Sequence, residues 1–293
     1  MPDVTKLVVG AQKPPCMSTE DSPLILGAGG WNIFHHFGVL KALEEHNISF
    51  GPVVGVSAGS ITAALVTNGY SPEEMVEIFL EVASMRNDLS TYLGSVTLSD
   101  PISMSIGGLL SLKPIFTKLV EKYKLEPNDR LKIVACDLFT HTPFVFEGCH
   151  YNLVDALAAS GAVPGVYQPV WHMRGGLPKL LVDGAIYHYS PVEFTSGAAI
   201  VSKFRPADGH PREWKSPLDL YFHYREVFLP LAGNNRYVDS DKHLVIESGL
   251  PHVAALNNGL SEETLLSMVE NGYQVATRAI EEALDSGRFC NAA

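Results

Sequence analysis

A β-branched run passes through Gly-x-Ser-x-Gly directly into an alanine-rich stretch at residues 53–64. This order predicts a strand, a sharp turn and a helix, the local structure that exposes a nucleophilic serine on the tip of a turn. Gly55 and Gly59 flank Ser57 and leave room for the turn. The amino end of the following helix has free N–H groups that favour negative charge. The stretch therefore predicts Ser57 as a nucleophile, although the short motif alone also arises by chance.

The composition limits the classes of function. The chain has 293 residues, 46% of them hydrophobic, and a net charge of −11. This charge argues against nucleic-acid binding, which needs clustered Lys and Arg, and against electrostatic capture by anionic membranes. Contact with neutral or zwitterionic lipid through apolar surface stays open. We expect one domain at residues 23–293, preceded by a flexible N-terminal arm at residues 1–22.

The cysteines and histidines indicate neither disulfides nor metal. The four cysteines are widely spaced, which is typical of unpaired thiols in a reducing compartment. No zinc-ligand spacing links them to the eleven histidines, so we expect no metal and no other cofactor. No secretory pattern is present, and no apolar run reaches the ~18 residues of a membrane span. We therefore expect a cytoplasmic protein, with transient contact at a membrane surface left open.

Strand-like and helical stretches alternate along the chain. Strands are expected at residues 24–26, 53–56, 133–136, 144–146, 180–182 and 244–246, and helices at residues 33–46, 57–68, 114–123, 152–160 and 260–284, with one more beginning at Ser71-Pro72. The alternation predicts an α/β fold, a three-layer sandwich with a central, mostly parallel sheet and helices on both faces. In such sheets the chemistry lies beyond the carboxyl ends of the strands.

Three motifs directly follow predicted strands: residues 27–30, Ser57 and Asp183. We expect them to meet at one edge of the sheet. The small residues at 27–30 leave backbone N–H groups free to stabilise the negative oxygen of an attacked carbonyl. A dinucleotide-binding loop is the weaker interpretation, because Asn32 stands where the third glycine is needed.

The residues alone leave the base that activates Ser57 open. An α/β-hydrolase places an acid and then a histidine after its serine. Candidate histidines after Asp183 are His188, His210, His223, His243 and His252. None has a distinctive local setting, and Ser57 comes after only one preceding strand, which does not suit that fold.

Four ordered blocks resemble the patatin-like phospholipase family. They are Leu26-Gly27-Ala28-Gly29-Gly30 with the helix that follows, Gly55-Val56-Ser57-Ala58-Gly59-Ser60, residues 155–167 with Ala159-Ser160 and Pro164-Gly165, and Asp183-Gly184-Ala185 followed by Ser190-Pro191. The motif glycines are Gly55, Gly59 and Gly184. The likeness covers about residues 24–200. It implies a patatin-type α/β fold and hydrolysis of lipid acyl esters.

The resemblance also implies the roles of individual residues. Carried over to this sequence, the family's Ser–Asp dyad is Ser57 as nucleophile and Asp183 as base, with no histidine. The backbone N–H groups of Ala28, Gly29 and Gly30 form the oxyanion hole. The reaction passes through an acyl-enzyme on Ser57, which is released by a water that Asp183 activates.

Two departures from the family pattern bear on rate and substrate. Ala28 stands where the family has glycine, and Asn32 where it usually has Arg or Lys. We expect a phospholipase A or a broader lipid acyl hydrolase acting on a lipid or other acyl ester. The alternatives are a short-chain carboxylesterase or thioesterase, and a catalytically weakened lipid-binding protein. Head group, acyl length, activator and oligomeric state stay open.

Other residues have structural interpretations. We expect Asp137 to hold a turn and His36 to be a hydrogen-bonded core histidine. Trp31 either lines the acyl pocket or packs over the glycine loop. Residues 101–112 are ordinary core, with a lid as the alternative.

Overall fold

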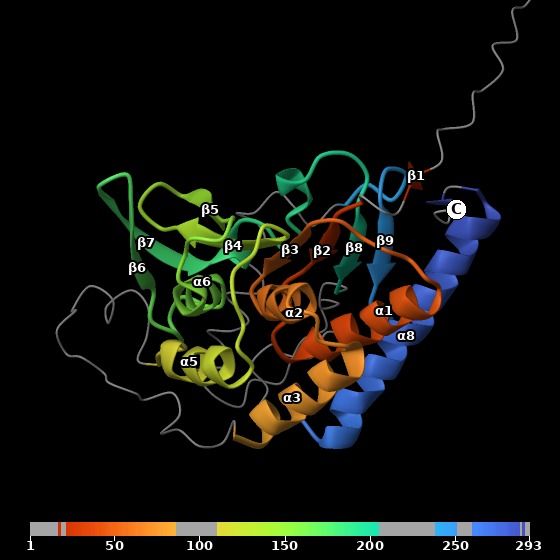
Figure 1. The fold of residues 1–293 in the computed structure, drawn as a ribbon, viewed down its shortest axis with the longest axis horizontal. Helices are drawn as coiled ribbons and strands as arrows, with labels where there is room; N and C mark the ends of the chain where they lie inside the picture. The colour runs from red at the N-terminus through yellow and green to blue at the C-terminus, as the bar shows by residue number, and fades with distance from the viewer. Residues whose placement is uncertain are drawn as a thin grey trace, which may run out of the picture.

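The structure is a computed structural model that describes residues 17–18, 22–85, 110–204, 238–250, 260–287 and 289–290. In these residues one sheet of eight strands forms the centre of the molecule (Figure 1). Its order is β6 (Val170–Arg174), β7 (Leu177–Asp183), β4 (Leu131–Asp137), β3 (Val53–Val56), β2 (Leu24–Leu26), β8 (Ile200–Lys203) and β9 (Leu244–Glu247), with β5 (Thr142–Phe146) paired to β4. The α/β prediction is confirmed.

The sheet is mixed. From β4 through β3, β2 and β8 to β9, neighbouring strands run parallel. At the other end, β5, β7 and β6 are joined by antiparallel pairings. The central strands β2 and β3 are buried along their whole length, as expected for strands covered on both faces.

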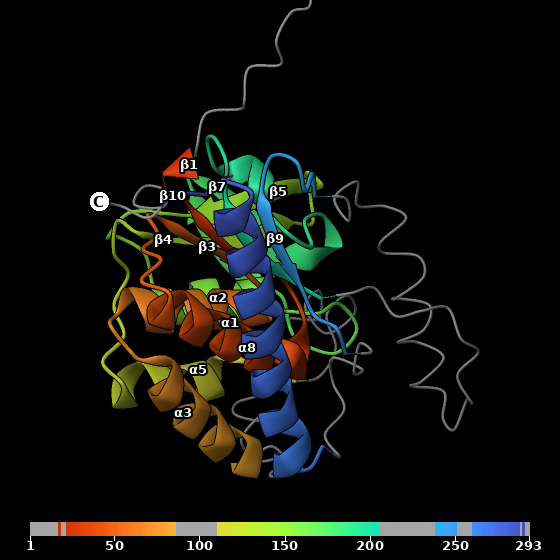
Figure 2. The same ribbon diagram turned by 90° about the vertical axis from the view of Figure 1, so that its right-hand side faces the viewer.

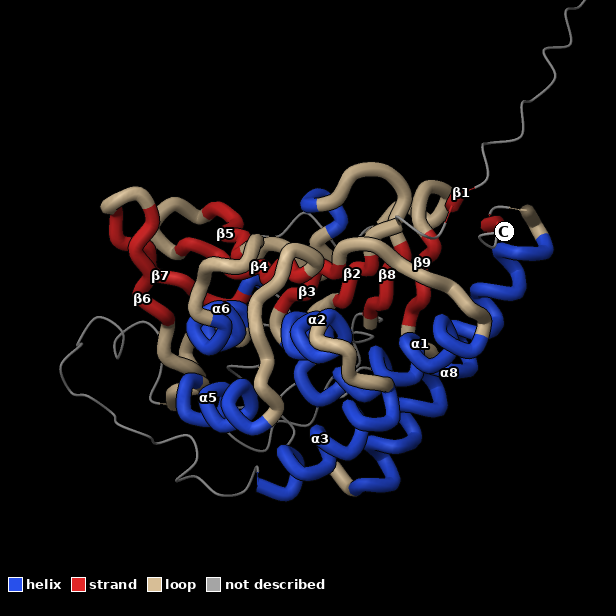
Figure 3. The backbone as a smooth tube through the Cα atoms, in the orientation of Figure 1, coloured by secondary structure: helices blue, strands red, loops and turns tan. Residues whose placement is uncertain are grey.

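Six α-helices lie on one side of the sheet in the described part of the chain (Figures 1 and 3). They are α1 (Ile33–Glu45), α2 (Ala58–Thr67), α3 (Pro72–Met85), α5 (Lys113–Lys122), α6 (Leu153–Ser160) and α8 (Glu262–Asp285). The opposite face buries Ile25, Val54 and Val201 beneath the segment that carries two short 3-10 turns, Gly184–Ile186 and Val192–Phe194. The described part of the third layer is therefore thin.

Helix starts follow their capping residues. Ser71 and Glu74 form a capping box: the Glu74 N–H donates to the Ser71 hydroxyl at 3.2 Å, and the Ser71 N–H donates to the Glu74 carboxylate at 2.8 Å. Asn152, the residue before α6, accepts from the Asp155 N–H at 3.0 Å. These local bonds explain why the beginnings of α3 and α6 could be located from sequence.

Helix α8 crosses α1 with backbone close to backbone (Figure 2). A Cβ atom on Gly38 would collide with the Val269 carbonyl and lie 2.6 Å from the Tyr273 nitrogen. A Cβ on Gly272 would collide with the His35 carbonyl. Only glycine at both positions allows this approach.

Two strands of the sheet, β6 and β8, lie outside the predicted set. Part of the predicted N-terminal arm is paired, since Met17–Ser18 runs parallel to Phe289–Cys290. The rest of that arm, residues 1–16 and 19–21, lies outside the described residues. So does most of the candidate lid, of which residues 110–112 are described. No helix in the described ranges is long and apolar enough to cross a membrane.

Candidate active site

The turn between β3 and α2 holds Ser57 in a strained conformation. Ser57 has φ 51° and ψ −122°, on the positive side of φ where non-glycine residues are uncommon. A Cβ on Gly55 would lie 2.5 Å from the Ser60 Cα, and one on Gly59 would collide with the Leu26 carbonyl. The two motif glycines are therefore required by close packing around the turn.

Asp183 lies beside Ser57. The Ser57 hydroxyl donates to Asp183 Oδ2 at 2.8 Å across 126 residues of chain. Asp183 is buried at the end of β7, and its Oδ1 accepts from the Ala185 N–H at 2.8 Å. Gly184 follows it, where a Cβ would lie 2.5 Å from the Val134 carbonyl.

The strand register explains this meeting. Val56, the residue before Ser57, pairs with Val134 on β4. Ala135, the next residue of β4, pairs with Asp183 on β7. Strand β5 pairs with the other edge of β4 along residues 133–137, so the ends of β3 and β7 meet on one edge of β4, at Val134 and Ala135.

Ser160 fixes the backbone of the nucleophile turn. Its buried hydroxyl accepts from the Ser57 N–H at 2.9 Å and donates to the Val134 carbonyl at 2.7 Å. The Ser60 hydroxyl donates to the Ser57 carbonyl at 2.6 Å. The role of Ser160 was missed in the sequence, where its only signal was membership of a block of small residues.

The glycine loop after β2 offers two free donors. Among the described residues, no acceptor is found for the N–H groups of Gly29 and Gly30. Gly30 has φ 55°. The Ala28 N–H, by contrast, donates to the Tyr189 carbonyl at 3.1 Å. The expectation that Ala28 also donates into an oxyanion hole is corrected here, because its N–H already has an acceptor.

The family model "Patatin-like phospholipase" matches residues 24–195, more than half of the chain. The chain belongs to this family. The match covers the turn of Ser57, the glycine loop and Asp183, the three motifs whose geometry is described above. Family membership thus agrees with the resemblance read from the four sequence blocks.

Similar proteins come from a virus, a fungus and a bacterium. "Probable lipid hydrolase 463L" of Invertebrate iridescent virus 6 is 23% identical over 193 residues, which cover 58% of this chain and 61% of the viral protein. A patatin-like phospholipase domain-containing protein of Chaetomium globosum is 25% identical over 177 residues, 53% of this chain and 19% of the fungal protein. The structure of VipD from Legionella pneumophila is similar at 14% identity and a TM-score of 0.49, over 90% of this chain and 67% of VipD. The chain spans less than two thirds of the viral and fungal relatives.

Two of the candidate histidines after Asp183 lie in the described part of this patatin-like chain, and both have partners other than Ser57. His188 contacts Glu193, and burial lowers the pKa of its imidazole. His243 accepts from the Ala199 N–H at 3.1 Å. His210, His223 and His252 lie outside the described residues.

Asn32 takes part in holding the loop where the family usually has a cation. Its side-chain nitrogen donates to the Gly29 carbonyl at 2.7 Å, and its backbone N–H donates to the same oxygen at 3.1 Å. These bonds fix the peptide between Gly29 and Gly30, whose N–H belongs to Gly30. Trp31 is half-buried and packs against the large core cluster on the helix side.

His36 supports the base of the same loop. Its Nε2 lies 2.9 Å from the Gly27 carbonyl and its Nδ1 lies 2.7 Å from the Ser202 hydroxyl. The carbonyl can only accept, so Nε2 carries the proton and Nδ1 accepts from Ser202. Burial lowers the pKa of His36 to about 4, and burial together with His36 lowers the pKa of His35 to about 3. His36 is a hydrogen-bonded core histidine, as predicted.

Acid is expected to destabilise the protein through this histidine. The folded pKa of His36 lies below its value of 6.5 in the unfolded chain, so the neutral ring favours folding. Its contribution is complete above pH 6.5 and is lost as pH falls towards 4. At pH 5 the loss is on the order of 2 kcal/mol for His36. Urea unfolding at pH 7 and pH 5 measures it, with His36→Gln as the variant that keeps an N–H donor.

His36→Gln removes only its own part of the acid response, because His35 remains. The difference in unfolding free energy between pH 7 and pH 5 is therefore smaller in the variant than in the wild type. Equal differences in the two proteins would contradict the assigned pKa shift of His36.

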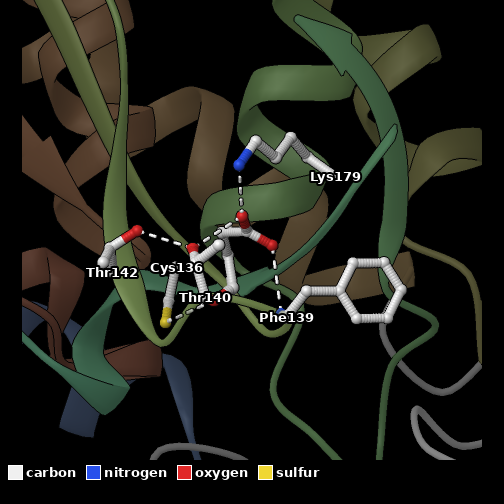
Figure 4. A network of polar contacts seen from close by, with 6 residues as sticks. Cys136, Phe139, Thr140, Thr142 and Lys179 are labelled. Atoms are coloured by element: carbon white, nitrogen blue, oxygen red, sulfur yellow. Dashed lines mark hydrogen bonds and ion pairs between the residues drawn. The ribbon is translucent and has the colours of Figure 1, made fainter. Parts of the chain in front are cut away.

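Asp137 anchors the end of β4 to β7 (Figure 4). Its buried carboxylate accepts from Lys179 Nζ at 2.8 Å, from the Thr140 hydroxyl at 2.7 Å and from the Phe139 N–H at 3.1 Å. Burial alone would raise the pKa of Asp137, but the Lys179 ammonium and the two other donors outweigh it and hold this pKa below its ordinary value. This agrees with the structural role predicted from sequence.

The described part of the chain holds no cluster of His, Cys, Asp or Glu that could bind a metal ion. Cys136 and Cys149 are free thiols. Burial, with Asp137 and Asp183 nearby, raises the pKa of Cys136 to about 12. Cys136 is therefore a protonated core side chain at neutral pH.

Proposed function

We propose that this chain is a serine acyl hydrolase that cleaves acyl esters of lipids through Ser57 and Asp183. The observation that carries the proposal is the 2.8 Å hydrogen bond from the Ser57 hydroxyl to the Asp183 carboxylate, on a strained turn at a helix amino terminus. Membership of the patatin-like phospholipase family supports the substrate class. The viral relative's name, a lipid hydrolase, points the same way.

The first half-reaction forms an acyl-enzyme. Asp183 takes the proton of the Ser57 hydroxyl while Oγ attacks the ester carbonyl carbon. The carbonyl oxygen becomes negative and is stabilised by the N–H groups of Gly29 and Gly30, at ~3 kcal/mol per donor. When the tetrahedral intermediate collapses, the alcohol leaves with the proton held by Asp183. Ser57 then carries the acyl group as an ester.

The second half-reaction returns the free enzyme. Asp183, again ionised, takes a proton from a water as that water attacks the acyl carbon of the Ser57 ester. The oxyanion forms at the same two N–H groups. Collapse releases the fatty acid, and the Ser57 oxygen recovers its proton from Asp183. One water is consumed and one ester bond is broken.

A small-ester hydrolase is the second candidate, and Asn32 is the residue that favours it. The family's usual cation near the loop would attract a phosphate head group, whereas the Asn32 amide is neutral and bonded to Gly29. Such an enzyme would prefer short neutral esters or thioesters. A lipid-binding protein without turnover is the remaining alternative from the sequence.

Covalent labelling tests the nucleophile directly. A fluorophosphonate probe is expected to attach at Ser57, identified by mass spectrometry of the modified peptide. Heat-unfolded protein and Ser57→Ala are expected to stay unlabelled. Labelling at another serine, or equal labelling of Ser57→Ala, would overturn the assignment of the nucleophile.

A substrate comparison then separates the candidates. Turnover of phosphatidylcholine micelles above that of p-nitrophenyl butyrate supports the lipid acyl hydrolase. Turnover of the short ester alone supports the second candidate. Lipid binding with no turnover of either substrate and no labelling would mean that the chain binds lipid without hydrolysing it.

A further inference from the structure

The hairpin of β6 and β7 exposes apolar side chains that the rest of the described surface mostly lacks. Five large hydrophobic residues are strongly exposed in the described part of the chain. Four belong to this region: Phe139 is 55% exposed, Trp171 40%, Met173 62% and Leu177 64%. The fifth, Leu266, lies on α8. Such a concentration marks a contact surface.

The end of the hairpin is exposed on both faces. Gly175 and Gly176, at φ 60° and 77°, make a two-residue turn, and residues 173–178 are all exposed. The register places Trp171 and Met173 on one face and Leu177 opposite Arg174 on the other. Strand β6 is the edge of the sheet, so no further described strand covers it.

The charge of this region differs from that of the whole chain. The chain carries 32 acidic residues, yet residues 156–182 contain no Asp or Glu. Arg174 is exposed, lies 4.9 Å from the Phe144 ring centre and has no ion-pair partner among the described residues. Lys179, in contrast, is neutralised by Asp137. The hairpin therefore combines apolar side chains with one unpaired cation.

The hairpin extends beyond the carboxyl ends of the central strands, where Ser57 lies. Strand β4 continues three residues past Val134, the partner of the last residue of β3. Strand β7 runs back along this extension, so Leu177 lies six residues, or about 20 Å, beyond Asp183. Figure 1 shows β6 and β7 at the end of the sheet away from α8. The Asp137–Lys179 pair fixes the base of the hairpin to β4.

We propose that Phe139, Trp171, Met173, Arg174 and Leu177, here called the hairpin tip, dock the protein on a zwitterionic phospholipid surface. The proposal rests on the proposed lipid hydrolysis, for which it supplies the route to a surface-bound substrate. Apolar side chains would enter the interface, Trp171 would lie at the head-group level, and Arg174 would meet a phosphate. A net charge of −11 disfavours strongly anionic surfaces, so apolar contact supplies most of the affinity.

The test measures binding to phosphatidylcholine vesicles by flotation, in a Ser57→Ala background so that lipid is not consumed. The double substitution Met173→Ser with Leu177→Ser is expected to weaken binding about tenfold or more. Leu266→Ser is the matched control, an exposed leucine on α8 rather than on the hairpin. It is expected to bind as the parent protein does. Adding phosphatidylserine to the vesicles is expected to give no gain in binding.

Enzymes with Ser57 intact give a second readout. The ratio of vesicle turnover to p-nitrophenyl butyrate turnover is expected to fall about tenfold in the double variant and to stay constant in Leu266→Ser. Soluble-ester turnover depends on the dyad and needs no surface. A wild type that does not hydrolyse p-nitrophenyl butyrate would therefore contradict the proposed function. Vesicle binding tests the hairpin tip separately.

Two results would overturn the docking proposal. One is undiminished vesicle binding by the double variant. The other is a wild type that does not bind vesicles but is a dimer by light scattering, together with a double variant that is a monomer. The hairpin tip would then be the contact surface for a second copy of the chain.

Discussion

Ser57→Ala, Asp183→Asn and the double variant are each expected to lower kcat on a soluble ester by about 10³-fold or more. The serine supplies the attacking oxygen, and a neutral amide at position 183 can no longer take its proton. Because both residues act in one proton transfer, the double variant is expected to be no slower than the slower single variant. Steady-state turnover of p-nitrophenyl butyrate measures all three.

Folding must be shown to survive these substitutions. Asp183→Asn keeps the side-chain size and an oxygen that accepts from the Ala185 N–H, so its urea midpoint is expected to stay near that of the wild type. An Asp183→Asn enzyme with nearly full rate would contradict the role of Asp183 as the base, and a histidine after Asp183 would then be the candidate base. Losses that simply multiply in the double variant would show that Ser57 and Asp183 act independently.

The turn of Ser57 could be predicted from sequence because its determinants are local. Gly55, Ser57 and Gly59 lie within five residues. A Cβ on Gly55 would clash inside this turn, whereas one on Gly59 would clash with Leu26 at the end of β2. The pairing of Ser57 with Asp183 depends on the register of β3, β4 and β7, which no local pattern contains. The residues alone left the base open, and only the family resemblance named Asp183.

The details of the glycine loop depend on distant partners. The Ala28 N–H is bonded to the Tyr189 carbonyl, which is far from the loop in sequence. The Gly27 carbonyl is bonded to His36, which belongs to helix α1. A sequence can show that a loop is small and flexible enough to bind an anion. It cannot show which of its N–H groups are already bonded. Asn32 likewise reads as a lost cation, although its amide holds the loop.

Strands β6 and β8 were missed for different physical reasons. β8 contributes four residues, too few for a pattern, and gains its place by pairing on both sides with β2 and β9. β6 lies at the edge of the sheet. Its large apolar side chains Trp171 and Met173 are exposed, so it does not follow the usual strand pattern of apolar residues on a buried face and polar residues on an exposed one. Helix α1 was predicted, but its burial almost all round depends on its place between the sheet and α8, which no local pattern contains.

Gly38→Ala is expected to lower the free energy of unfolding by at least about 2 kcal/mol. In an isolated helix the change would stabilise by roughly 1 kcal/mol, because alanine is the better helix former. Here the added Cβ would collide with the Val269 carbonyl on α8, a backbone group that cannot rotate away. Helix α8 must therefore move off α1, and apolar contacts on both sides of the crossing are lost.

Urea unfolding of Gly38→Ala and of three further variants tests this crossing. Gly161→Ala is the matched control, since its Cβ would meet the end of the Leu112 side chain at 3.1 Å and the Leu157 carbonyl at an ordinary contact distance of 3.5 Å. It is expected to change stability by less than about 0.5 kcal/mol. Gly272→Ala is expected to destabilise like Gly38→Ala, because its Cβ collides with the His35 carbonyl. The double variant is expected to cost less than the sum of the two, because one displacement of α8 relieves both collisions. A stabilised Gly38→Ala would mean that helix propensity dominates and that α1 and α8 are not in backbone contact.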